Sequence, residues 1–308
     1  MPFATTGPAA QDFYVTGHPW SACYLLDGKK PVLFESGYTC AGRLYEESIR
    51  TVLGKREPSI LFLTHVHYDH CGATGYLKRA FPSLLVAASE RAARIMERPN
   101  AWALMGELSA DAVSFVSETL EVDRSKLIDA PFEPFGVDLV LGDGQTVELG
   151  NTTVQVLASP GHTRDMLSYY IPERKILIAT EAVGVQDMTG RIIIAALTDY
   201  DAYVASLERL SSLPVEVLCQ GHRLVWTGAG EVRDYFARAM AAAKSFREQV
   251  TRLLGEEQGS VERVVARIKV EEYDANPYPK QQEAAYLINL RVRVDSLARG
   301  SKERGPGP

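Results

Sequence analysis

Short apolar runs alternate with longer amphipathic stretches along the first third of the chain. Strand-type runs occur at residues 13–15, 23–26, 32–35, 60–63 and 84–88. Helical spacing of apolar residues lies between them, at residues 41–53 and 72–81. Residues 89–126 also have a helical pattern, which Pro99 interrupts. Strands that alternate with helices are typical of an α/β fold.

The middle of the chain returns to strand patterns. These occur at residues 138–141, 146–149, 153–157, 167–171, 175–179 and 215–218. An Asp143-Gly144 pair separates the first two runs, and such a pair is a strong hairpin signal. We therefore expect these two runs to pair as a hairpin. A helix is predicted at residues 200–210.

Strand patterns end near residue 230. Three helices are predicted beyond it, at residues 232–254, 261–270 and 281–297. The pattern predicts an α/β domain at residues 1–230, a helical extension at 231–299 and a disordered tail at 300–308.

Composition narrows the class of protein. The chain has 308 residues, a net charge of -6 and no basic cluster, which argues against nucleic acid or an anionic membrane as a partner. No apolar run approaches the ~20 residues of a membrane span. Residues 1–8 have neither the basic nor the apolar region of a secretory signal, so we do not expect one. The four cysteines include no CxxC pair, so we expect a cytoplasmic protein.

Five of the six histidines follow predicted strands. His65, His67 and His70 lie with Asp69 directly after the strand at 60–63. His162 and His222 each follow a glycine just beyond a later strand, at the sheet edge where α/β folds bind ligands. Residues two apart in extended chain face the same way, so His65 and His67 can converge on one ion.

The turn would direct Asp69 and His70 toward a neighbouring ion. His18 is the remaining histidine, and we interpret it as an ordinary hydrogen-bonded residue.

Thr64-His65-Val66-His67-Tyr68-Asp69-His70 resembles the HxHxDH motif of the metallo-β-lactamase superfamily, with Pro160-Gly161-His162-Thr163 and Gly221-His222 resembling its later motifs. The resemblance implies a four-layer αβ/βα sandwich. It also implies one metal on His65, His67 and His162, and a second on Asp69, His70 and His222. Further stretches, such as Asp201-Ala202-Tyr203, are similar to thioesterase-like quinolone-signal response proteins of pseudomonads.

One position departs from the superfamily pattern. The family usually supplies a bridging aspartate after a strand, where this chain has Ala179-Thr180-Glu181-Ala182. We interpret Glu181 as the bridging or terminal ligand, with a supporting role outside the metal shell as the alternative. Asp165 and Asp187 are nearby carboxylates that could compensate.

The ligand types suit two divalent transition-metal ions. Imidazole and carboxylate favour zinc, with iron or manganese as alternatives, over calcium or magnesium. Two ions ~3.5–4 Å apart can lower the pKa of a bound water to about 7 and polarise a carbonyl. Asp69 could then act catalytically, by orienting the hydroxide or by transferring a proton. Cys71 is interpreted as a packing residue.

We therefore predict a hydrolase of a small thioester or ester, with its catalytic domain at residues 1–230 and the helical extension at 231–299 capping the site. A lactonase or a phosphodiesterase on the same site is an alternative, as is an iron oxidoreductase. A regulatory protein that keeps the metal site and binds a partner is an alternative of another class. The expected partner is a small-molecule substrate, and a homodimer is left open.

Overall fold

The structure is a computed structural model that describes residues 6–277 and 280–303. The chain divides into two compact units. The first contains the chain up to Ala158, together with Asp165–Thr180 and Pro214–Val232. The second contains Ser159–Arg164, Glu181–Leu213 and the chain from Arg233 onward.

The first unit holds a seven-stranded sheet. Its strands follow one another in chain order: β1 Gly7–Ala10, β2 Phe13–Thr16, β3 Cys23–Leu26, β4 Val32–Phe34, β5 Ile60–Phe62, β6 Leu85–Ser89 and β7 Leu139–Leu141. β1 to β4 pair antiparallel, and β4 to β7 pair parallel. Parallel neighbours require crossover connections, and the helices between these strands supply them.

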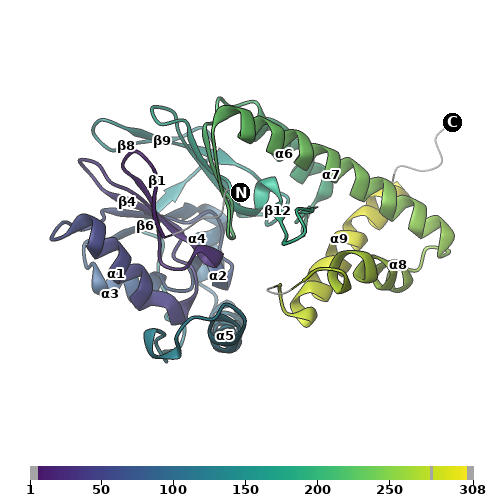
Figure 1. The fold of residues 1–308 in the computed structure, drawn as a ribbon, viewed down its shortest axis with the longest axis horizontal. Coiled ribbons are helices and arrows are strands. Elements are labelled where there is room, and N and C mark those ends of the chain that lie inside the picture. Colours follow the sequence, from purple (N-terminus) through teal and green to yellow (C-terminus); the bar gives the residue numbers. More distant parts are fainter. Residues whose placement is uncertain (1–5, 278–279, 304–308) are drawn as a thin grey trace. The chain divides into compact units, whose positions relative to one another are not determined.

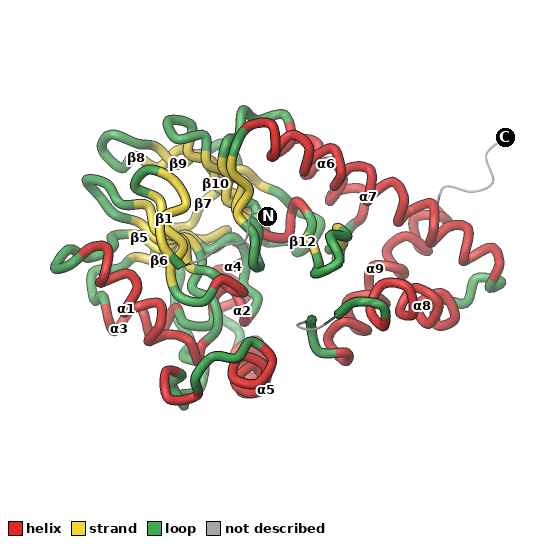
Figure 2. Tube along the Cα trace, in the orientation of Figure 1, coloured by secondary structure: helices red, strands yellow, loops and turns green. Residues whose placement is uncertain are grey.

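A six-stranded sheet completes the strand content of the first unit. Its order is β15 Val225–Thr227, β14 Val217–Cys219, β11 Ile176–Ile178, β10 Leu167–Ile171, β9 Thr153–Ala158 and β8 Thr146–Glu148. Only β11 and β14 are parallel, with Leu177 opposite Leu218. Figure 2 shows the strands of both sheets gathered in this unit.

The two sheets share one apolar core. The ring centroids of Phe34 on β4 and Phe62 on β5 lie 5.2 Å apart, and both rings contact the ring of Tyr169 on β10. Successive residues of a strand face opposite sides of the sheet. Leu33 and Leu61, the neighbours of these phenylalanines, therefore belong to a second core on the other face.

Helices cover that other face of the seven-stranded sheet. They are α1 Gly42–Leu53, α2 Tyr68–Cys71, α3 Thr74–Ala80, α4 Glu90–Met96 and α5 Pro99–Ser114. Ile49 of α1 and Leu77 of α3 are fully buried in the second core, and Figure 1 shows these two helices side by side. The predicted helices and strands of this region are confirmed within a few residues.

The turn at Asp143-Gly144 does not form the predicted hairpin. β7 belongs to the seven-stranded sheet and β8 to the six-stranded one. The turn instead bonds to β9, because Gly144 N donates to Val156 O at 2.9 Å and Asp143 Oδ1 accepts from Ala158 N at 2.8 Å. β9 thus supplies the hydrogen-bond partners of the turn. The chain crosses at this turn from the seven-stranded sheet to the six-stranded sheet.

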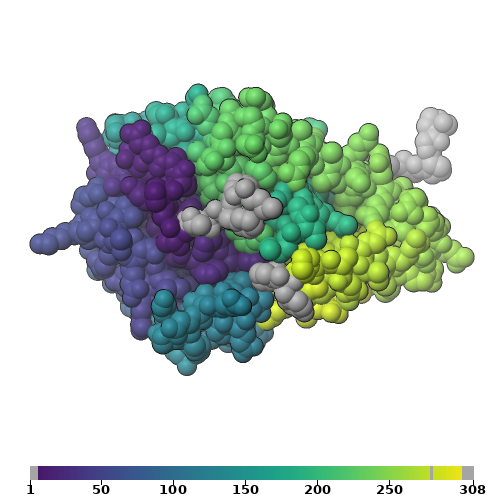
Figure 3. All heavy atoms as spheres, in the orientation of Figure 1, coloured from purple at the N-terminus to yellow at the C-terminus, as the bar shows by residue number. Residues whose placement is uncertain are grey.

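The second unit is mainly helical. It contains α6 Tyr200–Ser211, most of α7 Ala229–Glu256, α8 Val261–Lys269, α9 Glu283–Glu303 and a small sheet of β12 Val185–Gln186 with β13 Ile192–Ile193. α8 and α9 pack along each other (Figure 1 and Figure 3). Among the described residues, no helix combines the length and apolar composition that a membrane span needs.

Each unit is built from segments that are separate in the sequence, and the domain boundary expected near residue 230 stays a prediction. The segment Ser159–Arg164 joins the second unit because Thr198 N donates to Gly161 O at 2.9 Å and Ser206 Oγ to Pro160 O at 2.8 Å. Helices α7 to α9 lie within residues 229–303, and α9 continues to Glu303. Residues 304–308 of the expected tail lie outside the described residues, and the capping role stays a prediction.

Candidate metal centre

The loop after β5 brings His65 and His67 together in the first unit. His65 is fully buried, and its Nε2 lies 3.0 Å from His67 Nδ1. The other ring nitrogen of His65, Nδ1, lies 2.9 Å from the Thr64 hydroxyl. The expected convergence of these two imidazoles in extended chain is therefore present.

The next turn of chain presents Asp69 and His70. His67 is extended, with φ -90° and ψ 149°, and α2 begins directly after it. The amides of His70 and Cys71 both donate to His67 O at 2.9 Å, which fixes the turn. The Asp69 carboxylate thereby comes within 3.9 Å of His70 Nε2.

His222 reaches the same carboxylate from the six-stranded sheet. It lies just beyond β14, and its Nε2 is 3.6 Å from Asp69 Oδ2. Its Nδ1 lies 2.6 Å from the carbonyl of Trp20, in the short 3₁₀ helix η1 Pro19–Ser21. The Ser21 hydroxyl of the same helix donates to the Asp69 carbonyl. Both Asp69 and His222 are slightly exposed, at 17% and 18% of their side chains.

Glu35 is a member of this cluster that sequence reasoning missed. It follows β4, is 1% exposed, and lies 2.6 Å from His70 Nδ1 through Oε2. Its Oε1 accepts the Thr64 amide hydrogen at 2.7 Å. Its φ of 65° is unusual for a residue with a side chain, and such strain is commonly found at functional sites. A carboxylate at a strand end just before Ser36-Gly37 was the available signal.

His162 and Glu181 lie in the second unit, and both are about 5% exposed or less. His162 Nδ1 lies 2.7 Å from Ala195 O. The preceding Gly161 has φ 133°, and a Cβ there would lie 2.3 Å from the Tyr203 Cα. Only glycine therefore permits this approach.

Two buried tyrosines hold the backbone that carries Glu181. Tyr203 on α6 donates to Glu181 O at 2.8 Å. Tyr235 on α7 donates to Val183 O at 2.9 Å and to Gly184 O at 3.1 Å. Burial raises the pKa of Tyr203, so its hydroxyl keeps the proton that it donates.

The alternative carboxylates already have other roles. Asp165 accepts the Val66 amide at 3.0 Å and so braces the loop that carries His65 and His67. Asp187 accepts hydrogen bonds from Thr189 and Arg191 within its own exposed turn. Burial raises the pKa of the Cys71 thiol well above its ordinary value, with the charges of Glu35 and Asp69 adding to the effect. Cys71 therefore stays a neutral thiol, in agreement with a packing role.

The donor set of the first unit fits a metal ion. Asp69, His70 and His222 offer three ligand atoms within 4.8 Å of one another. Metal–ligand bonds of about 2.0–2.2 Å place two ligands of one ion at most about 4.4 Å apart. Asp69 Oδ2 lies within this limit of both histidines, at 3.9 Å from His70 Nε2 and 3.6 Å from His222 Nε2. A protein acceptor at Nδ1 leaves the Nε2 lone pair of a histidine available to a metal. His70, His162 and His222 all have such an acceptor.

Comparison with known proteins adds the family context. The model of the family described as "Metallo-beta-lactamase superfamily" matches residues 21–222. A hydroxyacylglutathione hydrolase of Bartonella henselae is 26% identical over 198 residues, covering 63% of this chain and 61% of that protein. The match thus spans less than two thirds of that relative's length. The human acyl-coenzyme A thioesterase MBLAC2 is 24% identical over 227 residues, covering 68% of this chain and 75% of that protein.

Solved structures agree on the fold. A metallo-beta-lactamase family protein of Thermus thermophilus matches with a TM-score of 0.63 and 20% identity, covering 98% of both chains. An archaeal superfamily protein of Sulfolobus tokodaii matches with a TM-score of 0.57 and 16% identity, covering 98% of this chain and 97% of that one. The α/β fold class expected from the sequence is confirmed. The more specific likeness to quinolone-signal response proteins stays a prediction.

Proposed function

Because the chain belongs to the metallo-beta-lactamase superfamily, we propose that it is a hydrolase of small thioesters that depends on two divalent transition-metal ions. Both curated relatives described above have names that denote hydrolysis of an acyl thioester, on glutathione or on coenzyme A. The observation that carries the proposal is the shared orientation of His70, His162 and His222, whose Nδ1 atoms each face a protein acceptor.

The proposed ligand assignment is the one that the superfamily motifs imply. His65 and His67 would hold one ion with His162, and Asp69, His70 and His222 would hold the second. Glu181 would bridge the two ions or bind one of them terminally. Zinc suits this mixture of imidazole and carboxylate, and iron or manganese would also be accepted.

When bound, two such ions supply a water nucleophile at neutral pH and an electrophile for the scissile carbonyl. The residues of the chain hold this arrangement in place. Asp69 is the partly exposed carboxylate of the set, so it is placed to orient the attacking water and to receive its proton. A thiolate leaving group needs little protonation, because its conjugate acid is far more acidic than an alcohol.

The net charge and the cysteines of the chain agree with a small-molecule substrate in the cytoplasm. A net charge of -6 disfavours polyanions such as nucleic acid. The four cysteines are free and buried, which suits the reducing cytoplasm, and we place the protein there.

Metal analysis and a substrate panel test the proposal together. Purified protein should contain about two transition-metal ions per chain, and a chelator should remove both the ions and the activity. The panel compares acyl-coenzyme A and acylglutathione thioesters with an acyl-homoserine lactone and an aryl phosphodiester. Turnover confined to the lactone or to the phosphodiester would contradict the thioester assignment.

Variants separate the ligands from their neighbours. His67→Ala and Glu181→Gln should each lower the metal content, whereas Asp187→Asn is a matched control that should leave it unchanged. Protein that binds no metal, or a Glu181→Gln variant that keeps two ions with unchanged affinity, would contradict the assigned site.

A further inference from the structure

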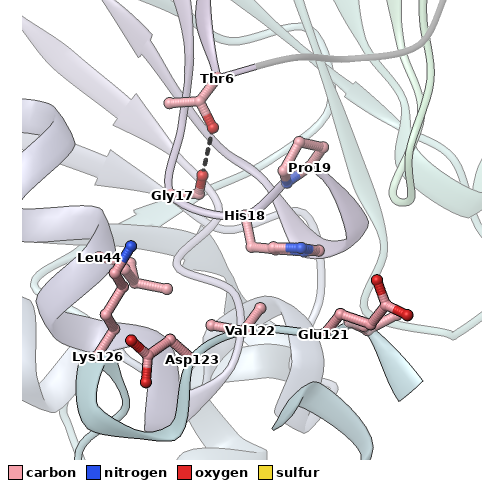
Figure 4. A pocket seen from close by; sticks show the side chains of 10 residues that line it. Thr6, Gly17, His18, Pro19, Leu44, Glu121, Val122, Asp123 and Lys126 are labelled. Atoms are coloured by element: carbon pink, nitrogen blue, oxygen red, sulfur yellow. Dashed lines mark hydrogen bonds between the residues drawn. The ribbon is translucent and has the colours of Figure 1, made fainter. Parts of the chain in front are cut away.

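The first unit contains a cavity apart from the histidine cluster. Its volume is about 330 Å³, and four segments of chain line it: Thr6, the loop after β2, α1, and residues 120–123 with Lys126 (Figure 4). This volume lies at the lower end of the range found for small-molecule sites. His18, the histidine outside the proposed metal site, lies in the wall of the cavity.

His18 offers the cavity a neutral hydrogen-bond donor. Its Nδ1 accepts the Trp20 amide hydrogen at 3.2 Å, so the ring proton is on Nε2. Burial lowers the pKa of His18, which keeps the ring neutral at pH 7. Figure 4 shows the ring lying between Pro19 and Val122.

Charges of both signs line the same cavity. Lys126 supplies a cation, and Glu121 and Asp123 supply carboxylates. Within the part of the chain that the structure describes, the side chains of Lys126 and Glu121 form no salt bridge or hydrogen bond. Glu121 also has a φ of 56°, a strained conformation for a residue with a side chain. The charge of Lys126 also acts on Asp123, whose carboxylate is held by Ser125, but the two form no salt bridge. Two charges of opposite sign without a salt bridge are complementary to a zwitterion, whereas a simple anion or cation would satisfy only one.

The remaining lining is apolar apart from Thr6, whose hydroxyl donates to Gly17 O at 2.6 Å. Leu44, Leu120 and Val122 contribute aliphatic surface, and Pro19 closes the wall beside His18. We propose that this cavity binds a free amino acid with an apolar side chain, whose carboxylate is held by Lys126 and His18 and whose ammonium group is held by Glu121. The apolar side chain of the ligand lies against the aliphatic residues.

The short helix η1 connects the cavity to the histidine cluster. The segment that supplies His18 and Pro19 to the cavity continues into Trp20, whose carbonyl lies 2.6 Å from His222 Nδ1. Ser21 follows and donates to the Asp69 carbonyl. A ligand that shifts η1 therefore shifts the supports of two residues in the proposed metal site. The cavity is thus a regulatory site, distinct from the place of chemistry.

Three ligands of similar size test the binding chemistry. L-Phenylalanine carries both charges, 3-phenylpropanoate carries only the carboxylate, and 2-phenylethylamine carries only the ammonium group. By calorimetry at pH 7.5, L-phenylalanine should bind about 10- to 100-fold more tightly than either analogue, the effect of one hydrogen bond to a charged group. Absence of binding, or equal affinity for all three, would overturn the proposal.

Exposed-residue variants assign the contacts. Lys126→Met should abolish the preference for L-phenylalanine over 2-phenylethylamine, which lacks the carboxylate. Glu121→Gln should abolish the preference for L-phenylalanine over 3-phenylpropanoate, which lacks the ammonium group. Lys55→Met is the matched control, since Lys55 is exposed and does not line the cavity, and it should bind like the parent protein. Binding that is unaffected by both cavity variants would place the ligand elsewhere.

Two readouts follow the connection through η1. Binding should change the tryptophan fluorescence, and Trp20→Phe should remove that change. L-Phenylalanine should also alter the rate of thioester hydrolysis in the parent protein and not in Lys126→Met. Binding with an unchanged rate would overturn the regulatory role. Because calorimetry needs no turnover, failure of the hydrolase proposal would leave the binding result intact.

Discussion

The carboxylate of Glu35 and the imidazole of His70 lie 2.6 Å apart, in a pair whose side chains are both 2% exposed. The pair joins the end of β4 to α2, and it orients the His70 ring so that Nε2 faces Asp69. A carboxylate behind a metal-binding histidine commonly sets the ring's tautomer and basicity.

Glu35→Gln should therefore weaken metal binding while the fold is kept. We expect a loss of roughly 10- to 100-fold in affinity for the ion on the His70 side, the usual effect of losing such a support. Competition with a coloured chelator measures this loss. Glu35→Asp provides a comparison that keeps the charge and shortens the reach. If Glu35→Gln binds both ions with the parent's affinity, the supporting role is wrong.

The tyrosines that hold the Glu181 backbone make a second prediction. Tyr203→Phe and Tyr235→Phe should each lower the free energy of unfolding by about 1 kcal/mol, the net value of one hydrogen bond, and should also weaken metal binding. Tyr170→Phe is the control, because its hydroxyl donates in the same way to Pro214 O at 2.9 Å, away from Glu181. It should show the stability loss alone. Equal metal affinity in all three variants would contradict the prediction.

A buried ion pair in the second unit should be essential for the stability of the helical extension. Arg293 and Glu272 are 3% and 6% exposed, with Nη1 and Oε1 2.6 Å apart. The guanidinium also lies 4.2 Å from the Phe246 ring. Arg293→Met should lower the free energy of unfolding by about 3–5 kcal/mol, because it leaves a buried carboxylate without its partner.

The matched surface variant is Arg291→Met, which removes an exposed pair with Glu262. Its cost should be below about 1 kcal/mol. Urea unfolding compares the two variants. Similar losses in both would mean that burial does not determine the strength of the Arg293 pair.

Two glycines should respond to alanine in opposite directions. A Cβ at Gly72 would lie 2.3 Å from Tyr68 O and 2.7 Å from Thr39 N, and neither backbone atom can move easily. Gly72→Ala should destabilise the protein by about 1–3 kcal/mol. A Cβ at Gly106, inside α5, meets no atom within 4 Å, so Gly106→Ala should stabilise by about 0.5–1 kcal/mol. Thermal unfolding would contradict this contrast if both variants moved the same way.

The pKa of His18 predicts a pH dependence of stability. Burial lowers this pKa in the folded state, so the unfolded chain binds a proton at a higher pH than the folded chain does. Stability is then complete above the ordinary histidine pKa of about 6.5 and is lost as the pH falls below it. The parent protein should therefore lose more stability than His18→Gln between pH 7 and pH 5. Parallel urea midpoints over this range would rule out the effect.

The strands, most helices and the histidine motif could be predicted because their signals are local. Leu33 and Phe34 alternate between two cores as the period of a strand requires. The convergence of His65 and His67 depends only on two residues of extended chain. The failed hairpin at Asp143-Gly144 marks the limit, since the turn was predicted correctly and its partner strand was not.

What the sequence by itself determined is the chemistry: which residue types are available, at which strand ends, and in what order. The tertiary structure alone decided their supports, because Glu35, Trp20 and Ala195 lie 35, 202 and 33 positions from the histidines that they contact. Such contacts arise when buried polar groups must find hydrogen-bond partners as the sheets pack. No local pattern encodes which distant carbonyl or carboxylate then meets each imidazole.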